Sequence, residues 1–201
     1  MVVDNGDYLN VIERKIIDDL RVFFNTHHTT DNDSVIKVFG QFPEPEELKF
    51  PSVIVEQVGS GFEEKLMGES ITVTNPVDGT TSSYTGELYG VAFVINILTD
   101  KDSEYNIGTS PQGTSNAKYK QRRLLNWMML NIANVINSID WATEVDDTVF
   151  ANTGLSYNPK FDKSVEVVES HLRAWRDVGY LPAFQWYGAT AEFSLVFKNY
   201  R

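Results

Sequence analysis

The sequence contains no cysteine and only three histidines among its 201 residues. The missing cysteines exclude disulfide bonds, thiolate zinc sites and a cysteine nucleophile, and they fit a reducing compartment. No apolar run approaches the ~20 residues that a transmembrane helix needs. The opening stretch, MVVDNGDYLN, lacks the basic and apolar regions of a signal peptide. We therefore expect a soluble protein made in the cytoplasm, with no membrane partner.

Basic residues are also scarce, since 17 lysines and arginines face 28 acidic residues and the net charge is -11. Proteins that bind nucleic acid in general need a basic surface, because release of counterions from phosphates drives that binding. The chain is therefore not expected to bind DNA or RNA in this way. An acidic surface instead suits a protein that DNA passes without sticking.

Motifs of known chemistry are missing as well. The sequence has no P-loop and no G-x-S-x-G, and GSGF lacks the third glycine of a dinucleotide site. Asp100, Asp102 and Glu104 alternate as in a calcium loop, but Tyr105 stands where that loop needs glycine. Glu169 and His171 share one face of a predicted strand, which favours an ion pair over an acid–base pair. We expect no catalytic residue, no bound metal and no cofactor.

One polar loop leaves an enzymatic alternative open. The stretch HHTTDND offers His27, His28, Asp31 and Asp33 as possible metal ligands, without a recognisable zinc spacing. A solvated loop is the simpler interpretation. The alternative is a small metal-dependent hydrolase that uses these four side chains.

The hydrophobic patterns predict helices over residues 8–24 and 119–137 and several strands. The second helix should pack through the stripe of Leu125, Met128, Ile132 and Ile136. Alternating or apolar runs predict strands at VIKVFG and SVIVEQV, in two hairpin arms over residues 62–74 and 83–99, and over residues 164–178 and 188–198. The predicted fold is α+β, a mixed and mainly antiparallel β-sheet with two principal helices packed on one face.

The hairpin arms differ along their length. They are polar and contain glycine near the tip, NPVDGTTSS, but are apolar on both faces near the base, YGVAFVINIL. We therefore expect a long projecting β-hairpin at about residues 62–99, within a single domain that spans residues 1–201. QFPEPEELKFP cannot form regular structure because it holds three prolines. The stretch TDKDSEYNIGTSPQGTSN is expected to be a connecting loop.

Two adjacent arginines open the second predicted helix. Arg122 and Arg123 stand at its N-terminal end, where the helix dipole gives a cation no benefit. We interpret them as ligands of an acidic patch on a neighbouring subunit, because the arginine fork suits carboxylates. Two solvated arginines are the equally simple alternative.

The stretch FQWYG gathers aromatic side chains in a connection between strands. Tyrosine and tryptophan are favoured at interfaces, so Trp186 and Tyr187 are candidate contact residues, whereas Trp175 is expected to belong to the core. A β-rich ligand-binding module built on Trp186 and Tyr187 is another alternative.

The order of these features resembles that of the tail-terminator, or tail-completion, proteins of tailed bacteriophages, and more loosely that of other neck proteins. The resemblance covers most of the chain. It rests on the N-terminal helix, FPSVIVEQ, the hairpin that closes on GELYGVAFVINILT, the helix RRLLNWMMLNIANVI and a C-terminal strand pair. The length of the chain, TNPVDGTTSSY and QFPEPEELKFP depart from compact members, so another ring-forming head–tail connector or neck protein stays the nearest alternative.

The resemblance implies a structural virion protein of the tail or neck, not an enzyme. Such proteins form a ring, usually a hexamer, at the head-proximal end of the tail. The ring ends polymerisation of the tail-tube protein and joins the tail to the head–tail connector protein, while DNA passes through the lumen without specific binding. Asp100, Asp102 and Glu104 are candidate lumen acids. The candidate interface residues are Arg122, Arg123, Glu63, Glu64, Lys65, Trp186 and Tyr187.

Overall fold

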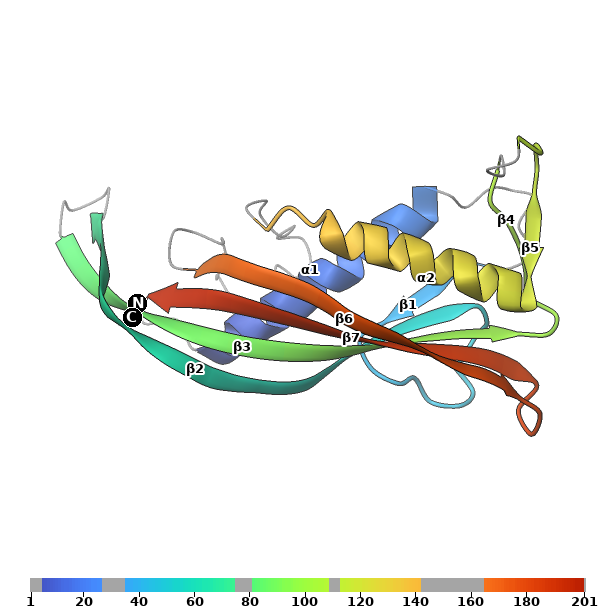
Figure 1. Cartoon of the computed structure of the whole chain (residues 1–201), viewed down its shortest axis with the longest axis horizontal. Coiled ribbons are helices and arrows are strands. Elements are labelled where there is room, and N and C mark those ends of the chain that lie inside the picture. Colours follow the sequence, from blue (N-terminus) through green and yellow to red (C-terminus); the bar gives the residue numbers. More distant parts are fainter. Residues whose placement is uncertain (1–4, 27–34, 75–80, 109–112, 142–164, 201) are drawn as a thin grey trace.

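The computed structural model describes residues 5–26, 35–74, 81–108, 113–141 and 165–200 (Figure 1). The elements follow in the order α1 (Asn5–Thr26), β1 (Lys37–Phe39), β2 (Ser52–Thr74), β3 (Thr81–Asp100), β4 (Glu104–Asn106), β5 (Lys118–Lys120), α2 (Gln121–Asn137), β6 (Val165–Leu181) and β7 (Trp186–Tyr200). Both predicted helices are therefore present, and each of the predicted strands overlaps a strand of the structure.

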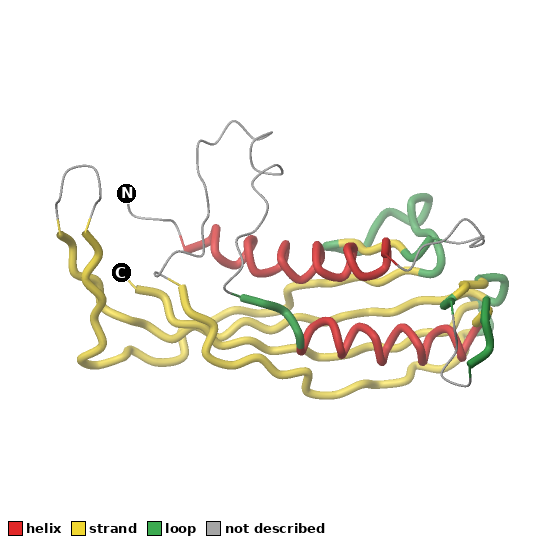
Figure 2. The backbone as a smooth tube through the Cα atoms, turned by 90° about the horizontal axis from the view of Figure 1, so that it is seen from above, coloured by secondary structure: helices red, strands yellow, loops and turns green. Residues whose placement is uncertain are grey.

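One long, curved sheet carries the fold. Its five strands lie in the order β1-β2-β3-β7-β6, and all neighbours are antiparallel except β1 and β2. The two helices lie side by side on one face of this sheet (Figures 1 and 2). The prediction of an α+β fold, with a mixed and mainly antiparallel sheet under two helices, is confirmed.

The core lies between the sheet and the helices. Because side chains of a strand alternate between faces, every second residue of β3 and β7 turns toward the helices. Phe93 and Phe193 are directly opposite each other in the register, and their stacked rings are 6.2 Å apart at the core's centre. The predicted stripe of α2 is buried against them: Leu125, Met128, Ile132 and Ile136.

The first helix joins this core through a stripe of Ile12, Ile16, Leu20 and Phe24, all buried. Trp127 of α2 lies against the rings of Phe24 and Tyr105, at centroid distances of 6.3 and 5.6 Å. The hydroxyl of Tyr105 donates a hydrogen bond to the carbonyl of Phe24 across 3.2 Å. Aromatic packing and this one bond hold the end of α1 to the small sheet that precedes α2.

That small sheet corrects two predictions. Residues 99–116 were expected to be a loop, but β4 lies within them, and the helix expected from residue 119 begins at Gln121, after β5, which pairs antiparallel with β4. Tyr105 and Tyr119 are opposite each other and buried, which gives the pair an apolar side. The strands are only three residues long and are separated by a glycine-containing loop, so their sequence pattern is too short to stand out.

A further correction concerns SVIVEQV, which was expected to be separate from the hairpin. It forms the start of β2, a continuous strand of 23 residues that pairs antiparallel with β3 as far as Thr74 and Thr81. The ladder with β7 ends at Gly86 and Tyr200, and β2 and β3 pair with each other beyond that point. That this outer part projects as an arm stays a prediction, and its tip, residues 75–80, lies outside the described residues.

Candidate interaction surfaces

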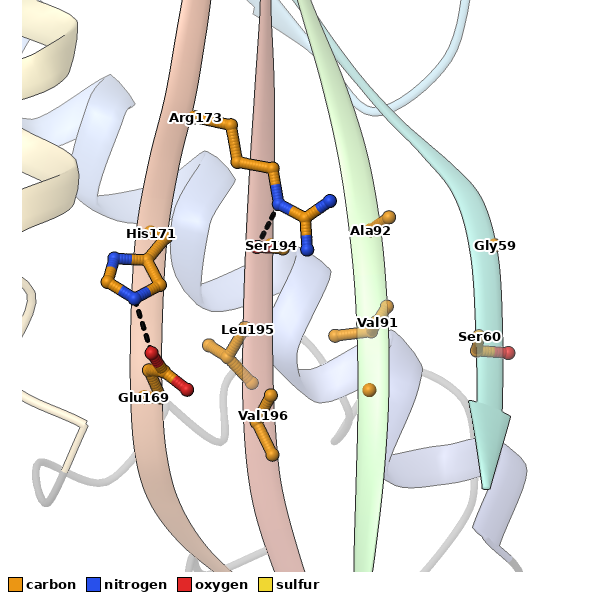
Figure 3. A pocket seen from close by; sticks show the side chains of 11 residues that line it. Gly59, Ser60, Val91, Ala92, Glu169, His171, Arg173, Ser194, Leu195 and Val196 are labelled. Atoms are coloured by element: carbon orange, nitrogen blue, oxygen red, sulfur yellow. Dashed lines mark hydrogen bonds and ion pairs between the residues drawn. The ribbon is translucent and has the colours of Figure 1, made fainter. Parts of the chain in front are cut away.

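The sheet face away from the helices holds a shallow hollow of about 340 Å³ (Figure 3). Strands β2, β3, β7 and β6 all contribute to its floor. Arg173 of β6 reaches across to β7, where its Nε donates to the hydroxyl of Ser194 at 3.0 Å. Small side chains such as Ala92 keep the floor low, and the hollow is open to solvent.

The predicted contact between Glu169 and His171 borders this hollow. Figure 3 shows the imidazole pointing at the carboxylate, and Nε2 of His171 contacts Oε1 of Glu169. The two residues are two apart on one strand, so they share a face. Both side chains are exposed, and water weakens such a pair. The predicted contact between the two side chains is present in the structure.

A chain of polar contacts crosses the same face. Asn96 on β3 donates from Nδ2 to Oε2 of Glu56 on β2 at 3.1 Å, and it accepts from Oγ1 of Thr190 on β7 at 3.0 Å. The three side chains satisfy one another across three strands. A partly exposed row of this kind is suited to water or to a polar protein surface.

The structure gives Arg122 and Arg123 partners within their own chain. Arg122 donates from Nη2 to Oδ2 of Asp177 on β6 at 2.7 Å, and the guanidinium of Arg123 lies 4.1 Å from the ring centroid of Tyr119. The unfavourable helix dipole is thus offset by a carboxylate and an aromatic face. Contact with a neighbouring subunit stays a prediction for both.

The other candidate interface residues fall in two places. Trp186 lies against the rings of Phe50 and Phe184, at 5.8 and 5.6 Å, and Tyr187 lies 4.9 Å from Tyr180. Within the described residues, the buried indole N–H of Trp186 meets no hydrogen-bond acceptor. Trp186 therefore joins the link between β1 and β2 to the start of β7. Trp175 packs against the core, as expected.

The three charged candidates at the hairpin, Glu63, Glu64 and Lys65, lie on β2, whereas Trp186 begins β7 at the opposite end of the sheet. Glu64 and Lys65 face Leu88 and Glu87 of β3, and Glu63 sits at an irregularity in the ladder. For these three residues the structure describes the backbone alone. Their role as contact residues stays a prediction.

The three candidate lumen acids have different environments. Asp100 accepts backbone hydrogen bonds from Asp102 at 3.2 Å and Ser103 at 2.6 Å, so it stabilises a turn. Glu104 lies 2.7 Å from Nζ of Lys118 and also contacts Lys120, and hydrogen bonds from these lysines lower the pKa of its carboxyl. Because two cations surround it, Glu104 is a poor source of repulsion toward phosphate. Asp102 is exposed.

In the described part of the chain, no three acidic or histidine side chains are placed so that they could hold a metal ion together. The alternative ligands His27, His28, Asp31 and Asp33 lie outside the described residues. The alternative of a metal-dependent hydrolase therefore stays a prediction.

The edge strand β6 has a regular distortion that we did not predict. Its ladder with β7 slips between Val167 and Glu169, between Leu172 and Ala174, and between Asp177 and Gly179. The skipped residues are Val168, Arg173 and Val178, five positions apart, and all three are exposed. Gly179 follows the last slip at φ +78° and donates its N–H to Oδ1 of Asp177 at 2.8 Å. A signal was present in the exposed valines, which break the alternation expected of a strand.

No helix in the described part of the chain is long and apolar enough to cross a membrane. A scan against protein-family models finds no matching family, and a search of curated proteins finds no matching sequence.

Proposed function

We propose that the chain is a structural phage virion protein, a tail terminator. It forms a ring at the head-proximal end of the tail, ends polymerisation of the tail tube and joins the tail to the head connector. The resemblance in element order supports this proposal. The observation that carries it is the sheet, which has both helices on one face and, in the described part of the chain, no helix on the other (Figure 1).

This arrangement favours protein contacts over chemistry. The hollow on the open face is shallow, and its charged groups are exposed or already hydrogen-bonded to neighbours. Long strand edges and a partly polar sheet face are surfaces that a second protein can cover. A ring protein needs such surfaces on two sides of each subunit, because each copy contacts a copy before it and a copy after it.

The direct test is to inactivate the gene in the phage that carries it and to examine lysates by electron microscopy. We expect tubes of uncontrolled length and filled heads without tails, and purified protein added to the lysate should cap the tubes. Tails of normal length on joined particles would contradict the proposal. Tails of normal length that fail to join heads would instead favour the neck-protein alternative.

A further inference from the structure

The two edges of the sheet differ in charge and in shape. At the β1 edge, the link between β1 and β2 carries Glu44, Glu46 and Glu47, all exposed. Backbone bonds from Glu47 and Leu48 to the carbonyl of Glu44, at 2.8 and 3.1 Å, order this segment as a turn. None of the three carboxylates has a cationic partner among the described residues. This acidic turn lies beside the sheet, on the side away from the helices (Figure 1).

The opposite edge of the sheet is strand β6, which carries Arg173 and Arg176. Arg173 hydrogen-bonds a neutral hydroxyl, and neither arginine has a carboxylate partner among the described residues. Two arginines without a carboxylate contact in the described residues stand out in a chain with a net charge of -11. A long arginine fork is the side chain best suited to carboxylates.

Exposed apolar side chains lie on the same two segments. Phe42 and Val58, exposed by 49% and 60%, lie on the β1–β2 link and on β2. Val168 and Val178, exposed by 52% and 46%, lie on β6, on either side of Arg173. Interfaces are made of apolar anchors with charged groups around them. Each edge therefore has exposed apolar and charged side chains, and on β6 the acidic Glu169 and Asp177 contact His171 and Arg122.

The bulges of β6 determine how this edge is used. A bulge leaves a residue unpaired and interrupts the row of backbone groups that a strand offers to a new partner. Three bulges at regular spacing disfavour the addition of a strand along the edge. They leave Val168, Arg173 and Val178 exposed and outside the ladder, with Arg173 lying across β7, so this margin of the sheet offers side chains rather than a row of backbone groups.

We infer that the β6 edge of one copy docks on the acidic turn of the next copy. Arg173 and Arg176 then meet Glu44, Glu46 and Glu47, while Val168 and Val178 cover Phe42 and Val58. Because the two surfaces differ, the contact is head-to-tail, and such a contact repeats until a ring closes. This inference rests on the proposed function and names the subunit contact of its ring.

The test is a charge reversal on each side, measured by sedimentation velocity of the full chain over a range of concentration and salt. R173E/R176E and E44K/E46K/E47K should each weaken association by at least about tenfold, since several ion pairs are lost and replaced by repulsion. The combined variant should recover most of the association. N126E/N134E, on the exposed side of α2, is the control for added charge and should associate like the wild type.

Cross-linking gives a second measurement, because the chain has no cysteine of its own. E46C and R176C, made as separate proteins and mixed under oxidation, should form the mixed dimer in excess over either self-dimer. A wild type that stays monomeric at all concentrations, reversals that change nothing, or a combined variant that does not recover would each overturn the inference. A ring that survives both reversals overturns the inference and leaves the proposed function standing, whereas normal tails without the gene overturn the proposed function even where the contact between copies is found.

Discussion

Arg122 is in the first turn of α2, and its Nη2 lies 2.7 Å from Oδ2 of Asp177 on β6. The contact joins the helix to the edge of the sheet. The two residues are 55 positions apart, and sequence spacing gives no sign of the contact. It explains how an arginine is tolerated at a helix N-terminus, where the dipole is unfavourable. A carboxylate brought by tertiary structure supplies the negative charge that local sequence lacks.

The contact between Arg122 and Asp177 should contribute little to stability. Their side chains are 69% and 37% exposed, and exposed ion pairs contribute about 0.2–1 kcal/mol. A double-mutant cycle with R122A and D177A, measured by urea unfolding, should give a coupling in that range that falls as salt is raised. A coupling of several kcal/mol that is insensitive to salt would show that the pair is shielded from water.

The centre of the core should respond far more strongly. Phe193 is 1% exposed and stacks on Phe93 across the strand pair, so F193A removes a buried ring and leaves a cavity. We expect a loss of about 3–5 kcal/mol in the free energy of unfolding. F184A is the matched control, because Phe184 is 70% exposed in a turn, and it should cost less than about 1 kcal/mol. Equal losses in the two variants would contradict the assigned core.

The fold could be predicted where a pattern repeats over many residues. The stripe of α2 and the alternation of β7 have one strong period each, and both elements lie within a few residues of their expected bounds. The strands β4 and β5 could not be predicted, since three residues hold no period. They pair because Tyr105 and Tyr119, opposite each other in the register, are both buried in the core.

The candidate surfaces were harder to predict than the fold. Glu169 and His171 were paired correctly because the strand period alone puts them together. Arg122 contacts Asp177, and Trp186 contacts Phe50. Both contacts join segments far apart in the sequence, so local spacing does not predict them. The bulged residues of β6 depend on how that strand fits β7, so they too are a property of the assembled sheet.

Glu104 should make the protein sensitive to acid. Hydrogen bonds from Lys118 and Lys120 lower the pKa of its carboxyl from the ordinary value of 4.5, so folding favours the ionised form. The stabilisation is present above that value and is lost as pH falls through the lower pKa of the folded state. E104Q should therefore be less stable than the wild type at neutral pH. The difference in free energy of unfolding should narrow below pH 4.5, and a difference that stays constant down to pH 2.5 would contradict the lysine contacts.

Tyr105 should make the protein sensitive to alkali. Burial raises the pKa of its hydroxyl from 10.0 to about 12, because the phenolate is costly to form away from water. The folded chain therefore holds this proton more tightly than the unfolded chain, and the stabilisation is lost as pH rises from about 10 to about 12. Y105F cannot ionise, so it should lack this part of the alkaline loss.

The comparison of wild type with Y105F isolates this one tyrosine. At neutral pH, Y105F should be less stable by about 0.5–1.5 kcal/mol, because the hydrogen bond to the Phe24 carbonyl is lost. That advantage of the wild type should shrink and then reverse as pH approaches 12. The phenolate absorbance of wild type minus Y105F should show a transition near pH 12 in the folded protein and near pH 10 in denaturant. A transition near pH 10 in both would place the hydroxyl in water and remove the contact that holds the end of α1.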